Sequence, residues 1–188
     1  IDKGYVSPYF VTNPERMEAE VKDVLIAVTD KKISTIQDIL PLLEKVAASG
    51  RKDLVIVADD FEGDSLSTFI LNKLRGTFNV LPVKAPGYGD KKKDMVADIA
   101  AIVGAEVISS DVGMSFENVT LSMLGKAARV ISQKDTTTFV GGKGKKADIA
   151  ERVAQLEALV ANTSSKFDKE KLEERIAKLS GGVAVIRV

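Results

Sequence analysis

The chain has 188 residues, of which 45% are hydrophobic and 29% are charged, a composition typical of a globular domain with a substantial core. Lysine plus arginine and aspartate plus glutamate both total 27, so no net charge favours a nucleic acid or an anionic membrane as partner. Cysteine and histidine are absent, which excludes disulfide bonds, most zinc sites and catalysis by a cysteine or histidine side chain.

The N-terminal half alternates between strand and helix patterns. Residues 4–12, GYVSPYFVT, predict an extended segment that Pro8 keeps out of the centre of a sheet. Apolar runs predict buried strands over 24–28, 54–59, 80–85 and 106–109. The helices expected between them cover 35–48 with Ser34 as cap and Gly50 as stop, 64–76, and 90–103 ended by Gly104. This order predicts right-handed βαβ units and a mostly parallel sheet.

The pattern changes after about Asp111. A short helix over 116–124 is expected to precede a β-hairpin of strands 128–133 and 136–140. The loop that follows, GGKGKK (141–146), is expected to be a mobile turn. Two closing helices are marked by the apolar spacing of Ile149, Val153, Leu156 and Val160, and then of Leu172, Ile176 and Leu179. The polar stretch 162–168 joins them as a helical hairpin, with Asp168 as a candidate cap.

The predicted fold class is therefore α/β. It has a mostly parallel βαβ core, an additional β-hairpin layer and a C-terminal helical hairpin. The closing residues, GGVAVIRV, form an apolar strand pattern that needs a partner and a continuation. We therefore expect the chain to be a fragment of a longer protein. No apolar run approaches the roughly 20 residues of a membrane-spanning helix.

The loop KAPGYGDKKK (84–93) is the first candidate for chemistry. It follows a strand and opens a helix, where α/β proteins bind phosphate with free N–H groups. Its spacing matches neither G-x-G-x-x-G nor G-x-x-x-x-G-K-[ST], and three adjacent lysines cannot all face one ligand. A structural loop with a solvated basic turn is the simpler interpretation. A phosphate- or nucleotide-binding enzyme domain built on this loop remains the alternative function.

The second candidate is an acidic cluster at the end of the strand 54–59. Asp59, Asp60, Glu62 and Asp64 lie where Mg²⁺ ligands are often found. Three of them also lie at the start of the next helix, where carboxylates stabilise the helix dipole without any metal. No catalytic set is evident, and no residue is assigned to catalysis or metal binding.

The strongest signal is an excess of apolar surface on two consecutive helices. In the helix 35–48 the apolar residues cover roughly 160°, and in the helix 64–76 roughly 200°, at about 100° per residue. A stripe that faces one core needs little more than about 100°. The surplus is explained either by further burial or by an exposed groove that binds peptide segments with little sequence preference. The pattern alone leaves both explanations open.

Five stretches together resemble the apical domain of the GroEL family, the bacterial group I (60 kDa) chaperonins. They are GYVSPYF, DKKIS, DLVIVADDFEGDSLSTFILNKLRG, VKAPGYGDKKKDMVADIA and DKEKLEERIAKLSGGVAVIRV. The similarity runs in order over the whole chain. It implies the swivelling β/β/α fold of that domain over residues 1–182, with 183–188 as the start of the connection to the intermediate domain. The equatorial ATPase domain lies outside this chain.

The resemblance also implies a function. In that family the apical domain binds non-native polypeptides and, in competition with them, the mobile loop of the co-chaperonin GroES. The binding residues that it implies here are Tyr5, Tyr9, Phe10, Leu40, Leu43, Leu66, Ile70, Leu71 and Asn72. Phe69 and Leu74 are assigned to the core of the domain. Phe61 and Phe69 are bulkier than the aliphatic residues usual there, and RKDL (51–54) is one residue longer than the usual loop.

The remaining expectations follow from the same resemblance. The fragment is expected to have no enzymatic activity and no cofactor, since ATP and Mg²⁺ are bound by another domain of the full-length family. The expected partners are unfolded or partly folded polypeptides and GroES, with no nucleic acid and no membrane. The full-length protein is expected to form a double heptameric ring in the bacterial cytoplasm, and the isolated fragment to be monomeric.

Overall fold

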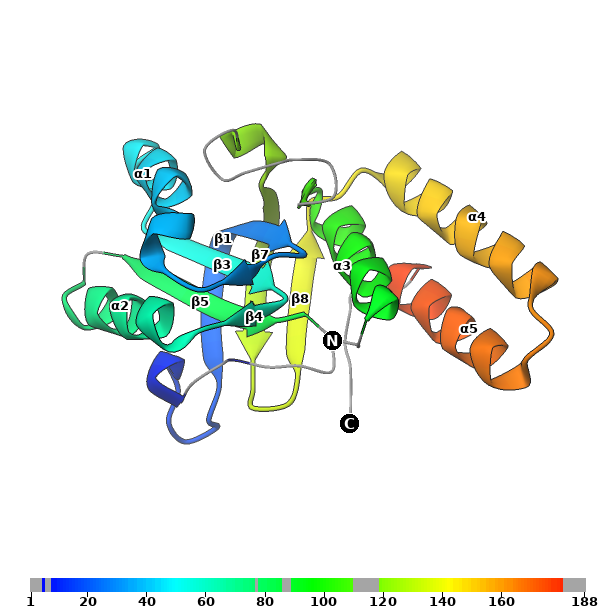
Figure 1. The fold of residues 1–188 in the computed structure, drawn as a ribbon, viewed down its shortest axis with the longest axis horizontal. Helices are drawn as coiled ribbons and strands as arrows, with labels where there is room; N and C mark the ends of the chain where they lie inside the picture. Colours follow the sequence, from blue (N-terminus) through cyan, green and yellow to red (C-terminus); the bar gives the residue numbers. More distant parts are fainter. Residues whose placement is uncertain (1–4, 6–7, 77, 86–88, 110–118, 181–188) are drawn as a thin grey trace.

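The computed structural model describes residues 5, 8–76, 78–85, 89–109 and 119–180. Within them a six-stranded sheet has the order β5-β3-β1-β7-β8, and β6 pairs with the end of β1 (Figure 1). The strands are β1 (Ala19–Thr29), β3 (Asp53–Ala58), β5 (Asn79–Lys84), β6 (Val107–Ile108), β7 (Gly125–Ser132) and β8 (Thr137–Gly142). A separate two-stranded pair joins β2 (Lys32–Ile33) to β4 (Asp60–Phe61). The predicted α/β class is confirmed.

The parallel part of the sheet forms as the apolar runs predict. β3 pairs in parallel with both β1 and β5, for example at Leu25 with Leu54 and at Leu54 with Val80. Residues 54–58 are fully buried, so both faces of β3 are covered, as is usual for parallel strands. The four predicted strands are therefore confirmed. They pair in parallel and are joined by helical connections, as βαβ units are.

The antiparallel part differs from the prediction. β7 and β8 form the expected hairpin, but β7 pairs directly with β1 from Ala19 to Ile26, so the hairpin extends the main sheet and is not a separate layer. The strand predicted over 24–28 is thus only the second half of β1. Its first half alternates apolar residues with the polar Glu20 and Lys22, a pattern that is stable because the neighbouring strand is antiparallel.

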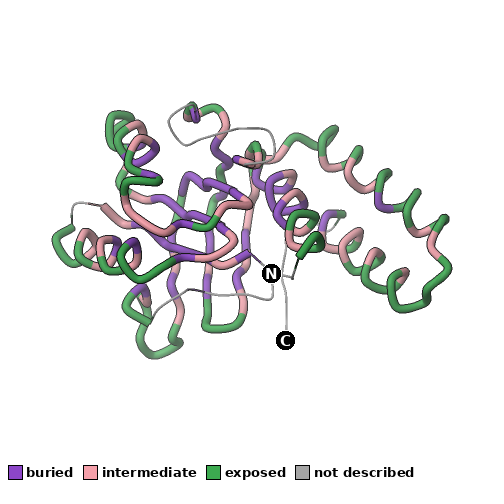
Figure 2. The backbone as a smooth tube through the Cα atoms, viewed as in Figure 1, coloured by how far each residue is buried: buried purple, intermediate pink, exposed green. Residues whose placement is uncertain are grey.

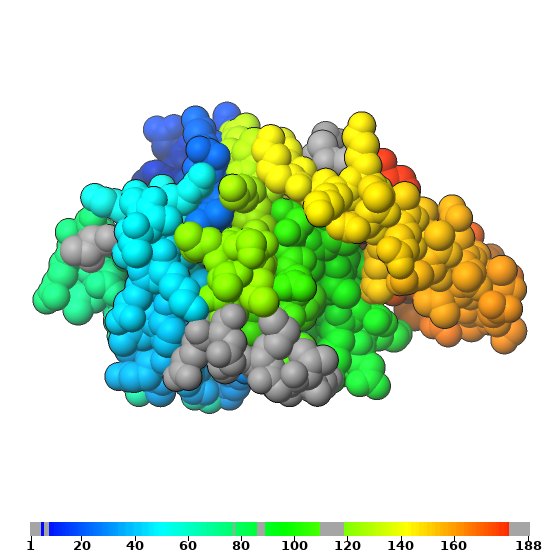
Figure 3. All heavy atoms as spheres, turned by 90° about the horizontal axis from the view of Figure 1, so that it is seen from above, coloured from blue at the N-terminus to red at the C-terminus, as the bar shows by residue number. Residues whose placement is uncertain are grey.

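The helices lie at two ends of the molecule, except for α3, which packs on the sheet between these ends (Figures 1 and 3). Their bounds are α1 (Leu40–Ala48), α2 (Gly63–Leu74), α3 (Asp90–Val103), α4 (Lys146–Asn162) and α5 (Lys166–Ser180). α1 and α2 lie at one end, and the α4–α5 hairpin projects at the other, attached to α3. Short 3₁₀ turns occur at η1 (Pro8–Phe10), η2 (Ile36–Asp38) and η5 (Leu121–Met123). None of the helices in the described part of the chain combines the length and apolar character needed to cross a membrane.

Two predicted helix boundaries are corrected and one is confirmed. The helix expected over 35–48 divides into η2 and α1, because Pro41 is suited to the first turn of an α-helix and not to its interior. Thr35, not Ser34, is the cap of η2, and the carboxylate of Asp38 accepts the backbone N–H groups of both. Gly104 ends α3 in the left-handed conformation, as predicted.

Two further predictions concern the second half of the chain. Asp168 is not the cap of α5; it lies in the first turn, and its backbone N–H donates to Ser165 Oγ at 3.4 Å. Of the helix predicted over 116–124, residues 116–118 lie outside the described residues, and only Leu121–Met123 of the remainder are helical, as the short η5. The two closing helices are confirmed, with Leu156 and Leu179 as their buried residues.

The glycines of GGKGKK are part of the packed structure. Gly141 and Gly142 end β8, and the Gly144 N–H donates to the carbonyl of Ile102 at 3.0 Å. A Cβ atom on Gly144 would lie 2.0 Å from the carbonyl oxygen of Ala101. The expectation of a mobile turn is therefore wrong for these residues, because their lack of side chains lets the loop contact the last turn of α3 directly.

This contact predicts that Gly144→Ala lowers the free energy of unfolding by about 2 kcal/mol, since the backbone of the loop or of α3 must move. Urea denaturation measures the change. Gly63→Ala is the matched control, because a Cβ atom on Gly63 meets nothing within 4 Å. Equal stability of the two variants would contradict the close contact at Gly144.

Candidate functional site

α2 has one face in the core and another in water (Figure 2). Its buried side chains are Phe69, which is fully buried and meets Phe61 edge-on at 6.4 Å, and Ser65, whose hydroxyl donates to the carbonyl of Ile33 at 3.2 Å. Leu71 is 46% exposed and Leu74 is 77% exposed. The assignment of Phe69 to the core is confirmed. The assignment of Leu74 to the core is wrong, because the last residue of α2 extends into solvent.

Leu66 and Ile70 lie between these extremes. Both are half-buried and pack against the edge of the core. Together with Leu74 they follow the spacing i, i+4, i+8, which places them along one side of the helix. Asn72 is half-buried on the same helix. α2 therefore carries a row of apolar side chains that is only partly used by the core of the domain.

The segment η1 lies against the C-terminal half of α2 (Figure 1). Lys73 Nζ donates to the carbonyl oxygens of Tyr9, at 3.2 Å, and of Val11, at 3.5 Å. Phe10 is buried at 2% exposure, whereas the side chain of Tyr9 is 73% exposed. Of the two aromatic residues, Tyr9 is thus the exposed one, and Phe10 anchors the segment in the core.

Tyr5 has a different environment from the one expected of a binding residue. Its side chain is buried, with 8% exposure. Its N–H donates to the carbonyl of Gln133 at 3.1 Å, and it forms an isolated antiparallel bridge with Val83 of β5. The structure therefore places Tyr5 in the core, where it links β5 to the turn between β7 and β8.

α1 contributes less exposed surface than its sequence suggests. Leu40 is 42% exposed at the first position of the helix, whereas Leu43 is buried at 7% exposure. Leu43 is therefore a core residue, because this face of α1 packs inward together with Leu42 and Val46. The start of α1 is tied to the start of α2 through the β2–β4 pair and through contacts of η2 with α2.

We use the name α2 surface for Tyr9, Leu66, Ile70, Leu71 and Leu74. Three of these residues are exposed and two are half-buried. The tyrosine comes from a segment more than fifty residues away in sequence, and Lys73 joins the two parts. Leu74 was missed as a surface residue because the sequence does not indicate where the sheet beneath α2 ends.

The charged residues near the carboxyl ends of the parallel strands are paired with one another. Lys92 contacts Asp59 at 2.5 Å, Lys84 contacts Asp60 at 3.0 Å, and Lys32 contacts Glu62 at 2.5 Å. The hydrogen bond from Lys32 holds the pKa of the Glu62 carboxyl below its usual range. Residues 86–88 of the glycine loop lie outside the described residues. Two lysines of the candidate phosphate loop, Lys84 and Lys92, are thus already neutralised by carboxylates.

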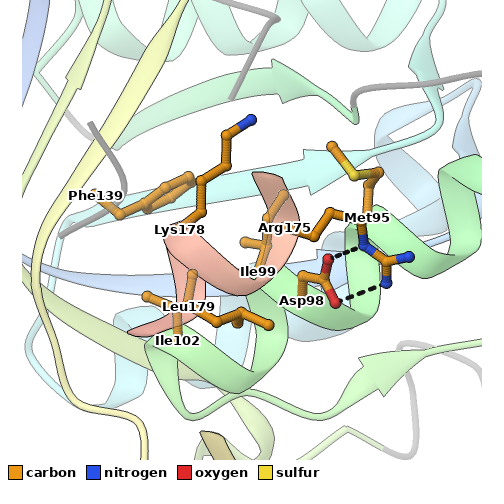
Figure 4. Close-up of a pocket in the computed structure, with 8 residues that line it drawn as sticks. All are labelled: Met95, Asp98, Ile99, Ile102, Phe139, Arg175, Lys178 and Leu179. Carbon is orange, nitrogen blue, oxygen red and sulfur yellow. Dashed lines mark hydrogen bonds and ion pairs between the residues drawn. The ribbon is translucent and has the colours of Figure 1, made fainter. Parts of the chain in front are cut away.

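A small cavity of about 30 Å³ separates α3, β8 and α5, with room for no more than a few water molecules (Figure 4). At its edge the buried carboxylate of Asp98 accepts hydrogen bonds from Arg175 Nε, at 2.6 Å, and from Arg152 Nε, at 2.8 Å. Arg175 is on α5 and Arg152 is on α4, so one carboxylate holds both helices of the hairpin. We interpret this cluster as structural.

A scan against known protein-family models finds no match for this sequence. Within the part of the chain that the structure describes, no group of three acidic, histidine or cysteine residues is arranged to hold a metal ion. The α2 surface is therefore the candidate site whose chemistry is clearest. It offers apolar contact and no reactive group.

Proposed function

We propose that the α2 surface binds exposed apolar segments of non-native polypeptides, as the apical domain of a group I chaperonin does. The observation that carries this proposal is the division of α2 into two faces. Phe69 fixes the helix to the core, while Leu71 and Leu74 lie in solvent, and Lys73 joins the same helix to the backbone of the exposed Tyr9. Exposed large apolar side chains gathered on one element are typical of protein interaction sites.

The proposed binding is physical and requires no catalysis. Burial of apolar surface contributes a favourable free energy of about 25 cal/mol per Å², whatever the sequence of the buried segment. Such binding therefore selects for hydrophobicity and not for sequence. The same surface is proposed to accept the mobile loop of GroES, which would displace a bound chain by competition. Leu40, at the start of α1, is proposed to extend the contact.

The proposal includes the larger assembly that the resemblance implies. Residues 1–182 would form a GroEL-like apical domain, joined through 183–188 to an intermediate domain and to an equatorial domain that binds ATP and Mg²⁺. A double heptameric ring in the bacterial cytoplasm would present several copies of the α2 surface to one client. The isolated chain, proposed to be monomeric, then binds more weakly, because multivalent contact multiplies affinity.

Leu71→Glu tests the proposal. We expect it to weaken binding to labelled, reduced and carboxymethylated α-lactalbumin, an unfolded chain, by about tenfold or more in fluorescence anisotropy. The unfolding midpoint is expected to stay nearly unchanged, because Leu71 is already exposed. Leu159→Glu is the matched control, since Leu159 is a leucine of similar exposure on α4, at the other end of the molecule.

Equal loss of binding in both variants, or in neither, would contradict the α2 surface as the site. The alternative of a phosphate- or nucleotide-binding domain has its own test. ATP or inorganic phosphate at millimolar concentration would then shift the amide NMR signals of Gly89 and Lys92. No structural observation favours this alternative, because Lys84 and Lys92 are paired with Asp60 and Asp59.

A further inference from the structure

Within the described residues, Lys73 makes two hydrogen bonds and one cation–π contact, and all three are with the segment that carries Tyr9. Its Nζ donates to the carbonyl oxygens of Tyr9 and Val11 and lies 5.8 Å from the centre of the Phe10 ring. Hydrogen bonds from a charged donor are stronger than those between neutral groups, and a cation over an aromatic ring adds a further attraction. One side chain of α2 thus holds three consecutive residues of another segment.

Other hydrogen bonds of this segment run within it or to the residues at the start of β1. Within η1 and its continuation, the Val11 N–H donates to the carbonyl of Pro8 at 3.1 Å, and the Thr12 N–H donates to the carbonyl of Glu18 at 2.9 Å. These bonds are local and set the shape of the segment without attaching it to α2. Phe10 attaches it to the core, and Lys73 joins it to the helix.

The environment of Lys73 is costly for a cation. The side chain is half-buried, and burial lowers the pKa of Lys73 from its usual value. No carboxylate of the described residues lies within ion-pair distance of its Nζ, so the two carbonyl oxygens and the ring are what compensates the charge. If the side chain at position 73 served only to fill space, an apolar residue would be more favourable there than lysine.

We propose that Lys73 is the positioning residue of the α2 surface: it clamps η1 onto α2 and so holds the backbone that carries Tyr9 against this helix. This inference rests on the function proposed above. It adds that Lys73 contributes to binding indirectly, by positioning the segment that carries Tyr9. Without Lys73, the segment that carries Tyr9 would have to be ordered against α2 at the moment of binding. That ordering reduces affinity.

The test compares Lys73→Met with Lys73→Arg. Methionine preserves most of the side-chain volume and removes both hydrogen bonds, whereas arginine retains a cation and several donors. We expect Lys73→Met to weaken binding to carboxymethylated α-lactalbumin about fivefold, as Tyr9→Ala does, and Lys73→Arg to restore most of it. The double variant with Tyr9→Ala is expected to bind no more weakly than either single variant, because both remove the same contact.

Two further measurements separate positioning from general damage. The rate of amide hydrogen exchange at Val11 is expected to increase in Lys73→Met and to return to the wild-type rate in Lys73→Arg. The unfolding midpoint is expected to change little, because water can replace Lys73 at the exposed carbonyl of Tyr9.

The possible failures are distinguishable. Faster exchange at Val11 with unchanged binding would overturn the positioning role while leaving the proposed function intact. Additive losses in the double variant would overturn it as well, since Lys73 would then act independently of Tyr9. Absence of binding by the wild-type chain would overturn the proposed function itself, whatever the exchange at Val11.

Discussion

Asp98→Asn is expected to lower the free energy of unfolding by about 3 kcal/mol. The substitution preserves the shape of the side chain but leaves Arg152 and Arg175 as partly buried cations without their carboxylate. This expected loss of stability is at the lower end of the range for broken buried ion pairs, because both arginines retain some contact with water. Burial disfavours the charged guanidinium of Arg175, but its hydrogen bond to Asp98 outweighs this and raises the pKa of Arg175. Urea denaturation measures the loss.

The matched control is Glu20→Gln. It also removes a carboxylate bonded to an arginine, Arg129, at a similar distance of 2.7 Å. That pair lies on the surface, where water screens the charges, so we expect almost no change in the unfolding midpoint. Similar effects of Asp98→Asn and Glu20→Gln would contradict the idea that one buried carboxylate fastens the α4–α5 hairpin to α3.

Phe69→Ala is expected to lower the free energy of unfolding by about 3–5 kcal/mol, because it removes a fully buried ring and its contact with Phe61. Leu71→Ala, two residues further along the same helix, is expected to change stability by less than about 0.5 kcal/mol, since Leu71 is exposed. For binding to an unfolded chain we expect the opposite order: at temperatures where both variants are folded, Leu71→Ala binds more weakly than Phe69→Ala. Thermal denaturation and fluorescence anisotropy on the same samples provide the comparison.

This pair of variants tests the separation of the two faces of α2. A large loss of stability in Leu71→Ala would mean that Leu71 belongs to the core. Full binding in Leu71→Ala together with weak binding in folded Phe69→Ala would mean that the partner approaches from the other face. Either result would contradict the α2 surface as we define it.

The parallel part of the fold could be predicted from the sequence because its signals are local. VLIAV and LVIVAD are continuous apolar runs, and Gly104 ends α3 with a conformation that glycine adopts easily. The first half of β1 could not be predicted in this way. Glu20 and Lys22 fit a strand here only because β7 pairs with one edge of β1 and one face of the strand is in contact with water. β7 lies more than one hundred residues away in sequence, so no local pattern indicates this pairing.

The candidate site was predicted only in part, for a similar reason. Helical spacing and the resemblance indicated Leu66, Ile70 and Leu71, and all three lie at least partly exposed on α2. The same reasoning could not separate Leu43 from Leu40, because both lie on apolar positions of α1 and only the packed structure distinguishes their burial. Lys73 carries no local signal, since its three contacts are with residues more than sixty positions earlier.

The hydrogen bonds of Lys73 reach main-chain oxygens and not side chains. A clamp of this kind does not depend on which amino acids occupy positions 9 and 11, as long as the backbone keeps its path. These two hydrogen bonds therefore persist whichever side chain stands at position 9. Evolution or a designed library could exchange the ring of Tyr9 for other side chains and so adjust which polypeptides the proposed site prefers, while these two bonds stay the same.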